Sequence, residues 1–573
     1  MTTTNATAYL EQRLGIQQQH EKDNALRGIL HTDDYENFVL RSDVGDELVV
    51  FQGAKQANRC LPGDHVRWDA EKGRCELELQ DQHPLLVGTL HLTQPARYGM
   101  TRRKVPLYLF TPYDGRYPQM IVGSSERDKT RNLLCLVQYE SWEPSTLFPR
   151  GLIQQYLGRS GDMEVERKAI HHQACPWKYP KIPFHPVLVS CSSLRRPLTG
   201  YTFHVDPKGC RDVDDILTVE PISDTHWKVV ITISDVAAYI EEGGAVDIMA
   251  SLIGQSVYDR TGRVLHAMLP AEYAEGTCSL LPGATKWGIS LEVIWDGTTL
   301  TDPVWYESEC RVNHSYTYEE FQEEPSAYQT IIREVASYLA GEPLLDSHAW
   351  IEHLMIYYNK EAGKKLRHAG QGILRRHAAG EKERVEAYRA HLSEWAFLAM
   401  SSAEYVMADD PNTFHSGLQT DAYAHVTSPI RRYADLVNQR ILKELLAHPE
   451  HPPRLIVPVA ICDLNHRERV IRQFERDLTF LESIEAGQTR VTARILEWEE
   501  AEGPQGPAYR VSFYVPDWKK RISALYQKVA EDVIATKDET ETRPLCLYEM
   551  VEIQCAVQWS FRNWKERLMV QWV

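Results

Sequence analysis

Short apolar runs separated by turn residues are the main pattern in the first third of the chain. Residues 48–51 and 65–68 are β-prone runs bounded by Gly, Pro and Asp, and a second series of such runs extends from Leu85 to Gly158. Short strands at this spacing predict small β barrels. We therefore expect two barrels in tandem, over residues 25–82 and 83–174, after a loose or helical arm at residues 1–24.

The pattern becomes helical after about residue 310. Apolar residues recur at the spacing of one helix face over residues 350–366, and again over residues 461–481. Mixed α/β sequence precedes these helices, and a proline-rich stretch at residues 175–200 is typical of an ordered connector. We expect one mixed α/β domain, including this connector, over residues 175–488.

Strand-type runs return from about Thr489 and continue to the end of the chain. Between them, residues 536–544 are charged and rich in threonine, which favours a loop. The rhythm of strands and turns predicts a third small β barrel over residues 489–573.

Composition and charge narrow the possible functions. The net charge of −17 argues against a protein that binds nucleic acid over its whole surface, although a basic groove can lie in an acidic body. The 11 cysteines include no Cys-x-x-Cys pair, which argues against a zinc ribbon or a disulfide framework and fits a reducing compartment. Residues 1–24 lack an apolar signal-peptide core, and no run has the length and apolarity of a membrane span. We expect a soluble, cytoplasmic protein without membrane association.

The densest chemical signal is an acidic stretch that contains Asp206, Asp212, Asp214 and Asp215. A β-prone run leads into it, and a Pro and a Gly interrupt the chain after the first aspartate. Asp212 and Asp214 share a face if the segment is extended, and Asp215 joins them only if the backbone kinks. Four neighbouring carboxylates repel one another, and a hard divalent cation such as Mg²⁺ relieves that repulsion. A solvated acidic turn and a metal site are both compatible with this stretch alone.

A second dense motif reads Thr-Ser-Pro-Ile-Arg-Arg-Tyr-Ala-Asp-Leu over residues 427–436. Together with the spacing Asp-x5-Asp-x-Asp-Asp, it resembles the RNB family of exoribonucleases, which includes RNase II, RNase R and the RNB-type nuclease of the eukaryotic exosome. The chain departs from the family at Val426 and at Gln439, where Phe and His are often found. Neither departure touches the residues proposed for catalysis.

The resemblance implies a multidomain α+β fold. It comprises two N-terminal OB-type cold-shock β barrels (25–82 and 83–174), a central mixed α/β RNB catalytic domain (175–488) and a C-terminal S1-type OB barrel (489–573). The last assignment depends on position and strand rhythm, because the usual glycine pattern of S1 domains is absent.

The resemblance also implies roles for the motif residues. Asp206, Asp212, Asp214 and Asp215 form a site for Mg²⁺, with Mn²⁺ as the alternative, and Asp214 is the most sensitive catalytic position. Arg431 is the catalytic arginine, since its planar, permanently charged guanidinium suits the scissile phosphate.

Further residues are expected to contact RNA. By the resemblance, Tyr258 stacks on a base near the 3′ end, Tyr318 fixes the last nucleotides, and Glu352 and Glu475 touch the terminal nucleotide or order the site. For such residues, core packing of the tyrosines and simple exposure of the glutamates are the competing explanations. Arg432 either contacts phosphate or pairs with Asp435. The apolar residues around the two arginines favour a partly buried turn into a helix: Pro429, Ile430, Tyr433 and Leu436. The basic run on the edge of the second barrel completes this set: Arg102, Arg103 and Lys104.

These expectations define a processive, Mg²⁺-dependent 3′→5′ exoribonuclease. It would act as a monomer on single-stranded RNA, without preference for DNA, and release nucleoside 5′-monophosphates. The alternatives are a catalytically inactive RNA-binding regulator on the same fold and a structural multi-barrel scaffold. The first is expected to lose aspartates from the acidic stretch, and the second leaves that stretch unexplained.

Overall fold

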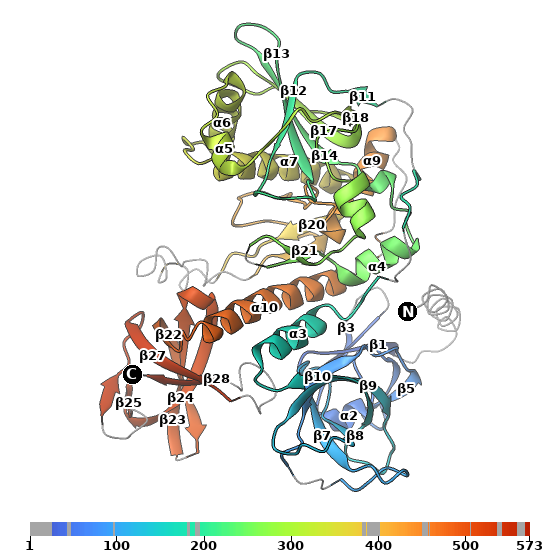
Figure 1. Cartoon of the computed structure of the whole chain (residues 1–573), viewed down its shortest axis with the longest axis vertical. Helices are drawn as coiled ribbons and strands as arrows, with labels where there is room; N and C mark the ends of the chain where they lie inside the picture. Colours follow the sequence, from blue (N-terminus) through green and yellow to red (C-terminus); the bar gives the residue numbers. More distant parts are fainter. Residues whose placement is uncertain are drawn as a thin grey trace. The chain divides into compact units, whose positions relative to one another are not determined.

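The computed structural model of the chain describes residues 26–42, 47–94, 98–179, 184–189, 195–259, 261–380, 386, 402–449, 457, 459–504, 506–535, 541–558 and 568–572. They fall into two compact units (Figure 1). The central unit is Trp177–Arg469, and the barrel unit combines residues up to Pro176 with Val470–Val573. The arm expected at residues 1–24 lies outside the described residues. No helix among the described residues combines the length and apolarity needed to cross a membrane.

The N-terminal part of the barrel unit contains two five-stranded sheets. Strands β1–β5 pair in the order β3-β2-β1-β4-β5, and strands β6–β10 close into a barrel. Within the described residues β3 and β5 do not pair, so the first sheet is open where the second is closed. The strands are β1 (Arg27–Thr32), β2 (Asn37–Arg41), β3 (Glu47–Gln52), β4 (His65–Asp69), β5 (Arg74–Leu79), β6 (Leu86–Leu90), β7 (Leu107–Pro112), β8 (Met120–Gly123), β9 (Leu133–Ser141) and β10 (Arg150–Arg159), with the short helix α2 (Ala54–Ala57) between β3 and β4.

These two sheets share one hydrophobic core. Leu30 and Phe38 from the first sheet and Phe110 and Met120 from the barrel belong to the same buried cluster. Strand β1 alternates half-buried and buried residues, as a strand with one face on a core does. The two N-terminal modules are therefore packed together rather than linked loosely.

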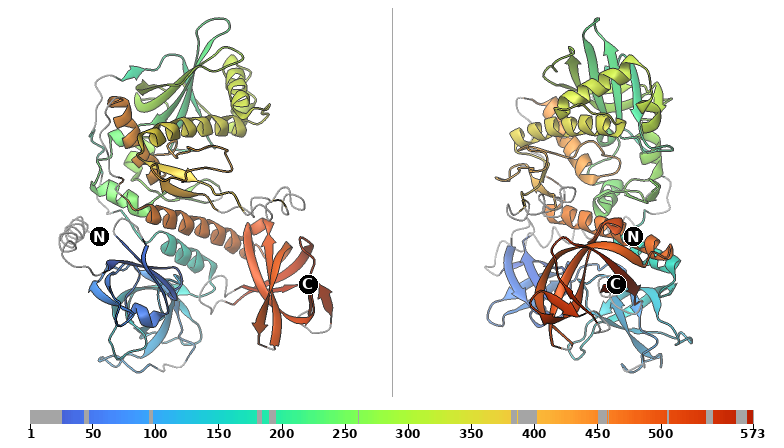
Figure 2. Two further views of the ribbon diagram at one scale, coloured as in Figure 1. Left: turned by 180° about the vertical axis from the view of Figure 1, so that it is seen from behind. Right: turned by 90° about the vertical axis from the view of Figure 1, so that its left-hand side faces the viewer.

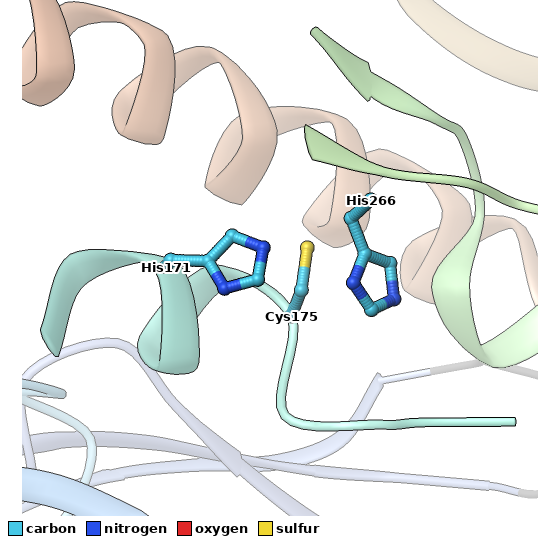
Figure 3. A group of neighbouring side chains, drawn as sticks. All are labelled: His171, Cys175 and His266. Carbon is cyan, nitrogen blue, oxygen red and sulfur yellow. The ribbon is translucent and has the colours of Figure 1, made fainter. Parts of the chain in front are cut away.

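Helix α3 (Met163–Ala174) follows the barrel. Asp162 caps its N-terminus by accepting a hydrogen bond from the Val165 N–H at 3.2 Å. At its other end, the Cys175 N–H donates to the His171 carbonyl at 2.8 Å, and both side chains are drawn in Figure 3. The third residue in that view, His266, belongs to the central unit.

The C-terminal part of the barrel unit is a seven-stranded sheet in the order β26-β25-β24-β23-β22-β27-β28. It curls strongly, so that β28 also approaches β24 (Figure 2). Its strands are β22 (Arg490–Gly503), β23 (Gly506–Val515), β24 (Lys520–Ala530), β25 (Val533–Ala535), β26 (Thr542–Pro544), β27 (Met550–Val557) and β28 (Leu568–Trp572), and a 3₁₀ turn η5 (Pro516–Trp518) lies between β23 and β24.

The prediction of a loop over residues 536–544 is wrong for the last three of these residues. Thr542–Pro544 forms the edge strand β26, in which Thr542 pairs with Ala535 and Pro544 with Val533. A proline is tolerated there because an edge strand has one side without ladder hydrogen bonds. Residues 536–540 lie outside the described part, and the S1-type assignment of this sheet stays a prediction.

The central unit is built on a seven-stranded sheet in the order β11-β18-β17-β14-β13-β12-β19. Its strands are β11 (Arg196–Pro197), β12 (Tyr201–Val205), β13 (Asp215–Pro221), β14 (Trp227–Ser234), β17 (Lys286–Trp295), β18 (Val304–Cys310) and β19 (His314–Tyr316). Two small pairs are separate from it: β15 (Val257–Tyr258) with β16 (Val264–His266), and β20 (Ile373–Arg376) with β21 (Glu404–Met407).

The central unit also contains several helices. They are α4 (Ala245–Ile253), α5 (Tyr318–Gln322), α6 (Ala327–Ala340), α7 (Ser347–Ala369) and α9 (Tyr433–Ala447), with short turns η2 (Val236–Ala238) and η3 (Glu272–Thr277); α10 (Ile461–Glu485) begins in this unit and ends in the barrel unit. Helix α7 lies between the sheet and the β20–β21 pair (Figures 1 and 2). Its Tyr358 hydroxyl donates to the Ile289 carbonyl of β17 at 2.9 Å. The expected multidomain α+β architecture is confirmed.

Candidate active site

The acidic stretch lies where two neighbouring strands of the sheet end and begin. Asp206 directly follows β12, and Asp215 is the first residue of β13, the antiparallel neighbour of β12. The two carboxylates therefore leave the sheet at the same end. The Asp206 N–H donates to the Tyr316 carbonyl at 3.1 Å, which holds this end of β12 against the end of β19.

A turn separates the first aspartate from the other three, as the sequence predicts. The Cys210 N–H donates to the Pro207 carbonyl at 3.0 Å, and Gly209 has a φ of 85°, where an L side chain is strained. The chain is not a strand at Asp212 and Asp214, so the alternation expected for an extended segment does not apply. Asp214 is instead buried at 3% exposure, while Asp212 is half-buried.

Asp214 joins the acidic stretch to the second motif. Its Oδ1 accepts a hydrogen bond from the Ile430 N–H at 2.9 Å, and its Oδ2 lies 3.2 Å from Arg431 Nε. Its backbone carbonyl accepts a hydrogen bond from the Ser234 N–H at 2.8 Å, which fixes the loop to the sheet. Burial raises the pKa of Asp214 well above its ordinary value, and the Arg431 charge opposes that rise only in part.

The second motif forms the predicted turn into a helix. The Arg432 N–H donates to the Ser428 carbonyl at 2.9 Å, and α9 begins at the next residue. The fully buried carboxylate of Asp435 accepts hydrogen bonds from the Ser428 N–H at 2.8 Å and from Arg432 Nη2 at 2.9 Å. The two arginines thus differ: Arg432 pairs with Asp435, whereas the side chain of Arg431 is 48% exposed and faces Asp214.

Helix α7 holds the segment that leads into this turn. Asn359 accepts a hydrogen bond from the Val426 N–H at 2.9 Å and donates to Thr427 Oγ1 at 3.2 Å. One turn later, Gly363 lets the segment approach the helix, because a Cβ there would lie 2.9 Å from the Ala422 carbonyl carbon. The position of Arg431 therefore depends on α7 as well as on its own turn.

A pocket of about 420 Å³ opens between these elements. It brings four of the predicted residues together: Asp215, Glu352, Arg431 and Arg432. The rest of its lining comes from α7 and from the segment before α9, namely Met355, Ile356, Asn359, His415, Leu418, Tyr423, His425, Thr427 and Ser428. The pocket is thus lined by two carboxylates, two arginines and several aromatic rings.

Within the acidic cluster, the surroundings of Asp215 disfavour its ionised form. Burial, and after it the neighbouring charge of Asp206, raise the pKa of Asp215 to about 7 against the opposing charge of Arg431. A divalent cation would stabilise the ionised carboxylate of Asp215, and the ligands that the aspartates offer it are all oxygen atoms. Buried Oδ2 of Asp214 also accepts no hydrogen bond within the described residues.

The donor set therefore fits a hard divalent cation. No three of the four aspartates hold oxygens within 4.8 Å of one another among the described residues. A hard cation that keeps several of its water ligands needs only a few direct protein ligands.

The two predicted tyrosines lie beside the aspartates. The Tyr258 hydroxyl donates to Asp212 Oδ2 at 2.5 Å, and its pKa is raised by burial and by that carboxylate. The Tyr318 ring stacks on His348 with centroids 3.8 Å apart, and its pKa is raised by burial and by the charges of Asp215 and Asp206. Their contacts with RNA stay predictions.

The remaining predicted residues belong to the barrel unit. Glu475 lies on α10, and burial raises its pKa. Arg102, Arg103 and Lys104 are exposed in the turn before β7. Their expected roles in RNA binding stay predictions.

Several residues of the site were not singled out from the sequence. Both ring nitrogens of His204 form hydrogen bonds, Nδ1 with Asp206 and Nε2 with Ser315. Tyr405 lies against His425, with the hydroxyl 2.9 Å from Nδ1. Burial lowers the pKa of His415 to about 4, so this pocket residue is neutral at physiological pH. His425 stands two residues before the second motif, which was a usable signal; the others depend on tertiary contacts.

Comparisons with known proteins agree with this arrangement. The family model of the RNB domain matches residues 195–331 and 333–448, and that of the Dis3-like cold-shock domain 2 (CSD2) matches residues 107–174. Exosome complex exonuclease RRP44 homolog A of Arabidopsis thaliana is 22% identical, over 88% of this chain and 71% of that protein. Ribonuclease R of Aquifex aeolicus is 28% identical, over 43% of this chain and 46% of that protein. The chain spans 60% of the exosome complex exonuclease RRP44 of Mus musculus, at 21% identity over 82% of this chain.

Solved structures share the fold. Mycoplasma genitalium RNase R in complex with ribose methylated single-stranded RNA superposes with a TM-score of 0.69 at 16% identity, covering 96% of this chain and 100% of that one. Yeast Ssd1, a pseudonuclease, superposes with a TM-score of 0.63 at 17% identity, covering 89% and 81%. The chain thus carries an RNB domain and a Dis3-like cold-shock domain 2, on an RNase R-like multidomain fold.

Proposed function

We propose that this protein is a divalent-metal-dependent exoribonuclease that degrades single-stranded RNA processively from its 3′ end. The observation that carries the proposal is the pairing of Asp214 with Arg431 at 3.2 Å, which joins the two family motifs beside a pocket lined by Asp215 and both arginines. The relatives named as exosome exonucleases and ribonuclease R support the same reaction class. The expected products are nucleoside 5′-monophosphates.

The four aspartates would hold the metal, for which Mg²⁺ is the proposed ion and Mn²⁺ the alternative. When bound, such ions activate water and stabilise charge on the phosphate oxygens of a phosphodiester. Asp206 and Asp215 offer carboxylates at one end of the sheet, and Asp212 offers one that is oriented by the Tyr258 hydroxyl. All of these ligands are oxygen atoms, which favours Mg²⁺ over Zn²⁺.

The protein's own groups account for two further parts of the reaction. The half-exposed guanidinium of Arg431 is permanently charged and binds the scissile phosphate in a bidentate manner. The buried Oδ2 of Asp214 accepts no hydrogen bond among the described residues, and burial raises its pKa, so it is suited to accept a proton from the attacking water. Besides its share in the metal site, Asp214 therefore has two tasks: it orients Arg431 and it moves a proton.

A catalytically inactive RNA-binding regulator is the second candidate. The specific observation in its favour is the structural likeness to yeast Ssd1, which is a pseudonuclease on the same fold. Against it stand the complete set of four aspartates and Arg431.

One digestion experiment separates the candidates. The full chain is incubated with 5′-end-labelled poly(A) and Mg²⁺, with and without EDTA. Metal-dependent shortening of the RNA supports the exoribonuclease. RNA that is bound but uncut, in a parallel gel-shift assay, supports the regulator, and neither binding nor cleavage supports a structural scaffold. A parallel poly(dA) substrate tests whether a 2′-hydroxyl contact gives preference for RNA.

The oligomeric state that we propose for the active protein is the monomer. The residues proposed to bind the metal and the scissile phosphate all belong to the central unit. Two relatives are named as exosome complex components, so light scattering of the purified chain, alone and with RNA, tests the expected monomer.

A further inference from the structure

His204 is a buried histidine whose two ring nitrogens are both engaged next to the proposed metal site. It lies on β12 at 4% exposure, two residues before Asp206. Its Nδ1 is 2.8 Å from Asp206 Oδ2, and its Nε2 is 2.6 Å from Ser315 Oγ. Strands β12 and β19 run parallel here, with His204 directly opposite Ser315. The sheet itself therefore aligns Ser315, the imidazole and the carboxylate in one row.

The chemistry of the partners fixes the roles of the two nitrogens. An ionised carboxylate only accepts hydrogen bonds, so Nδ1 carries the proton that it donates to Asp206. In the neutral ring Nε2 is then an acceptor, and the Ser315 hydroxyl donates to it. The arrangement occupies one oxygen of Asp206, Oδ2, and leaves the other, Oδ1, for a metal. Asp206 is thereby tied to the imidazole through Oδ2.

We propose that His204 is a positioning residue for the metal site, which holds Asp206 in a metal-binding orientation while Ser315 fixes the tautomer of the ring. This inference rests on the proposed function, because it presupposes that Asp206 is a metal ligand. Hydrogen bonds from outer partners orient ligating groups, and their loss typically weakens metal binding about 10- to 100-fold. His204 itself does not touch the metal or the RNA.

The competing explanation is that His204 only satisfies buried polar groups. That role predicts a loss of stability without a specific loss of metal affinity. Metal affinity, measured in the absence of RNA, therefore distinguishes the two roles better than activity does. The melting temperature of the metal-free protein reports the structural contribution separately.

Two substitutions of His204 separate its two nitrogens. In His204→Asn the amide nitrogen is as many bonds from Cβ as Nδ1 is, so donation to Asp206 is retained. In His204→Gln the amide nitrogen corresponds to Nε2, so the contact with Ser315 is retained and that with Asp206 is lost. Thr202→Val is the matched control, because Thr202 lies on β12 like His204 and the substitution removes a buried hydroxyl–hydroxyl hydrogen bond of 2.9 Å to Thr218 of β13.

The assay is calorimetric titration of the full-length, metal-free chain with Mn²⁺. We expect His204→Gln to weaken Mn²⁺ binding about 10- to 100-fold. We expect His204→Asn and Thr202→Val to stay close to the wild type. Because Ser315 is exposed, Ser315→Ala should fold normally. Its Mn²⁺ affinity should lie between that of His204→Gln and that of Thr202→Val.

The outcomes are distinct. If the wild type itself binds no Mn²⁺, the metal site of the proposed function is wrong. If the wild type binds Mn²⁺ and His204→Gln binds it equally well, the positioning role of His204 is wrong. Should His204→Gln fail to fold, Ser315→Ala provides the test. If that variant binds Mn²⁺ as tightly as the wild type, Ser315 and His204 do not position Asp206.

Discussion

Replacing Asp214 by Asn tests whether this carboxylate serves catalysis or the fold. The substitution keeps the shape of the side chain and an oxygen that can accept the Ile430 N–H hydrogen bond. It removes the negative charge that faces Arg431 Nε at 3.2 Å, and it places an amide donor next to a guanidinium donor. The proposed proton acceptor, Oδ2, is lost at the same time.

The structure predicts opposite effects of Asp214→Asn on activity and on stability. Removing a preorganised charge of this kind costs about 10²–10³-fold in turnover, or about 2.7–4 kcal/mol of transition-state stabilisation. Breaking a buried ion pair is normally costly, because the partner is left buried and uncompensated. Arg431 is 48% exposed, however, and burial already disfavours the Asp214 carboxylate, as its raised pKa indicates. We therefore expect an unchanged or higher melting temperature.

A matched control is available in the same unit. Asp247 is buried at 2% exposure and pairs at 2.9 Å with Arg440, whose side chain is only 11% exposed. Asp247→Asn should lower the stability by about 3–5 kcal/mol, because it leaves a buried guanidinium without its partner. It should leave the rate of RNA digestion unchanged at temperatures where the protein is folded.

The assay combines single-turnover digestion of labelled RNA, a gel-shift measurement of RNA affinity and thermal unfolding. The expected Asp214→Asn variant binds RNA within about threefold of the wild type and turns over about 10²–10³ times more slowly. Near-normal digestion would refute the catalytic role of Asp214. Slow digestion together with a lowered melting temperature would show that the carboxylate serves the fold instead.

Three further predictions concern pH, salt and substrate shape. The folded-state pKa of Asp215, about 7, lies above its ordinary value of 3.8, so the metal-free protein should lose stability as the pH rises from about 4 to about 7 and should lose no more above that. Because metal competes with that proton, Mn²⁺ affinity should rise up to about pH 7 and then level off, and a flat profile in calorimetry would contradict the assignment. RNA affinity should fall steeply with salt, with a log–log slope of roughly −0.7 per phosphate contact, and neutralising Arg102, Arg103 and Lys104 together should reduce the slope by about 2. An unchanged slope would remove that turn from the RNA path. A hairpin with a long 3′ tail should be shortened rapidly and then stall near the stem, since stacking on aromatic rings requires unpaired bases. Equal rates on blunt duplex and on single strand would refute this last expectation on a sequencing gel.

The parts of the site that local sequence encodes were predictable. The Pro and Gly after Asp206 predicted the turn, and the apolar residues around Arg431 predicted a partly buried turn into a helix, both as the structure has them. The two motifs meet through Asp214 and Ile430, which are 216 residues apart in the sequence. That meeting was expected from the family resemblance, not from the spacing of residues.

Residues whose importance depends on the register between distant elements were not predictable. His204 matters because β12 pairs with β19 so as to bring Ser315 opposite it, and nothing near His204 in the sequence indicates that register. His415 enters the pocket through a segment without regular structure. Burial of Asp214, which decides its pKa, likewise results from tertiary packing.

The most direct test of the central claim is a time course with one RNA oligonucleotide labelled separately at each end, in Mg²⁺, using the wild type and Asp214→Asn. The account predicts that the 3′ label is released at once as a nucleoside 5′-monophosphate, while the 5′-labelled RNA is shortened from its 3′ end to a small end product. It also predicts that EDTA or Asp214→Asn stops both. Release of the 5′ label first, internal cleavage, or digestion that persists in EDTA would contradict it.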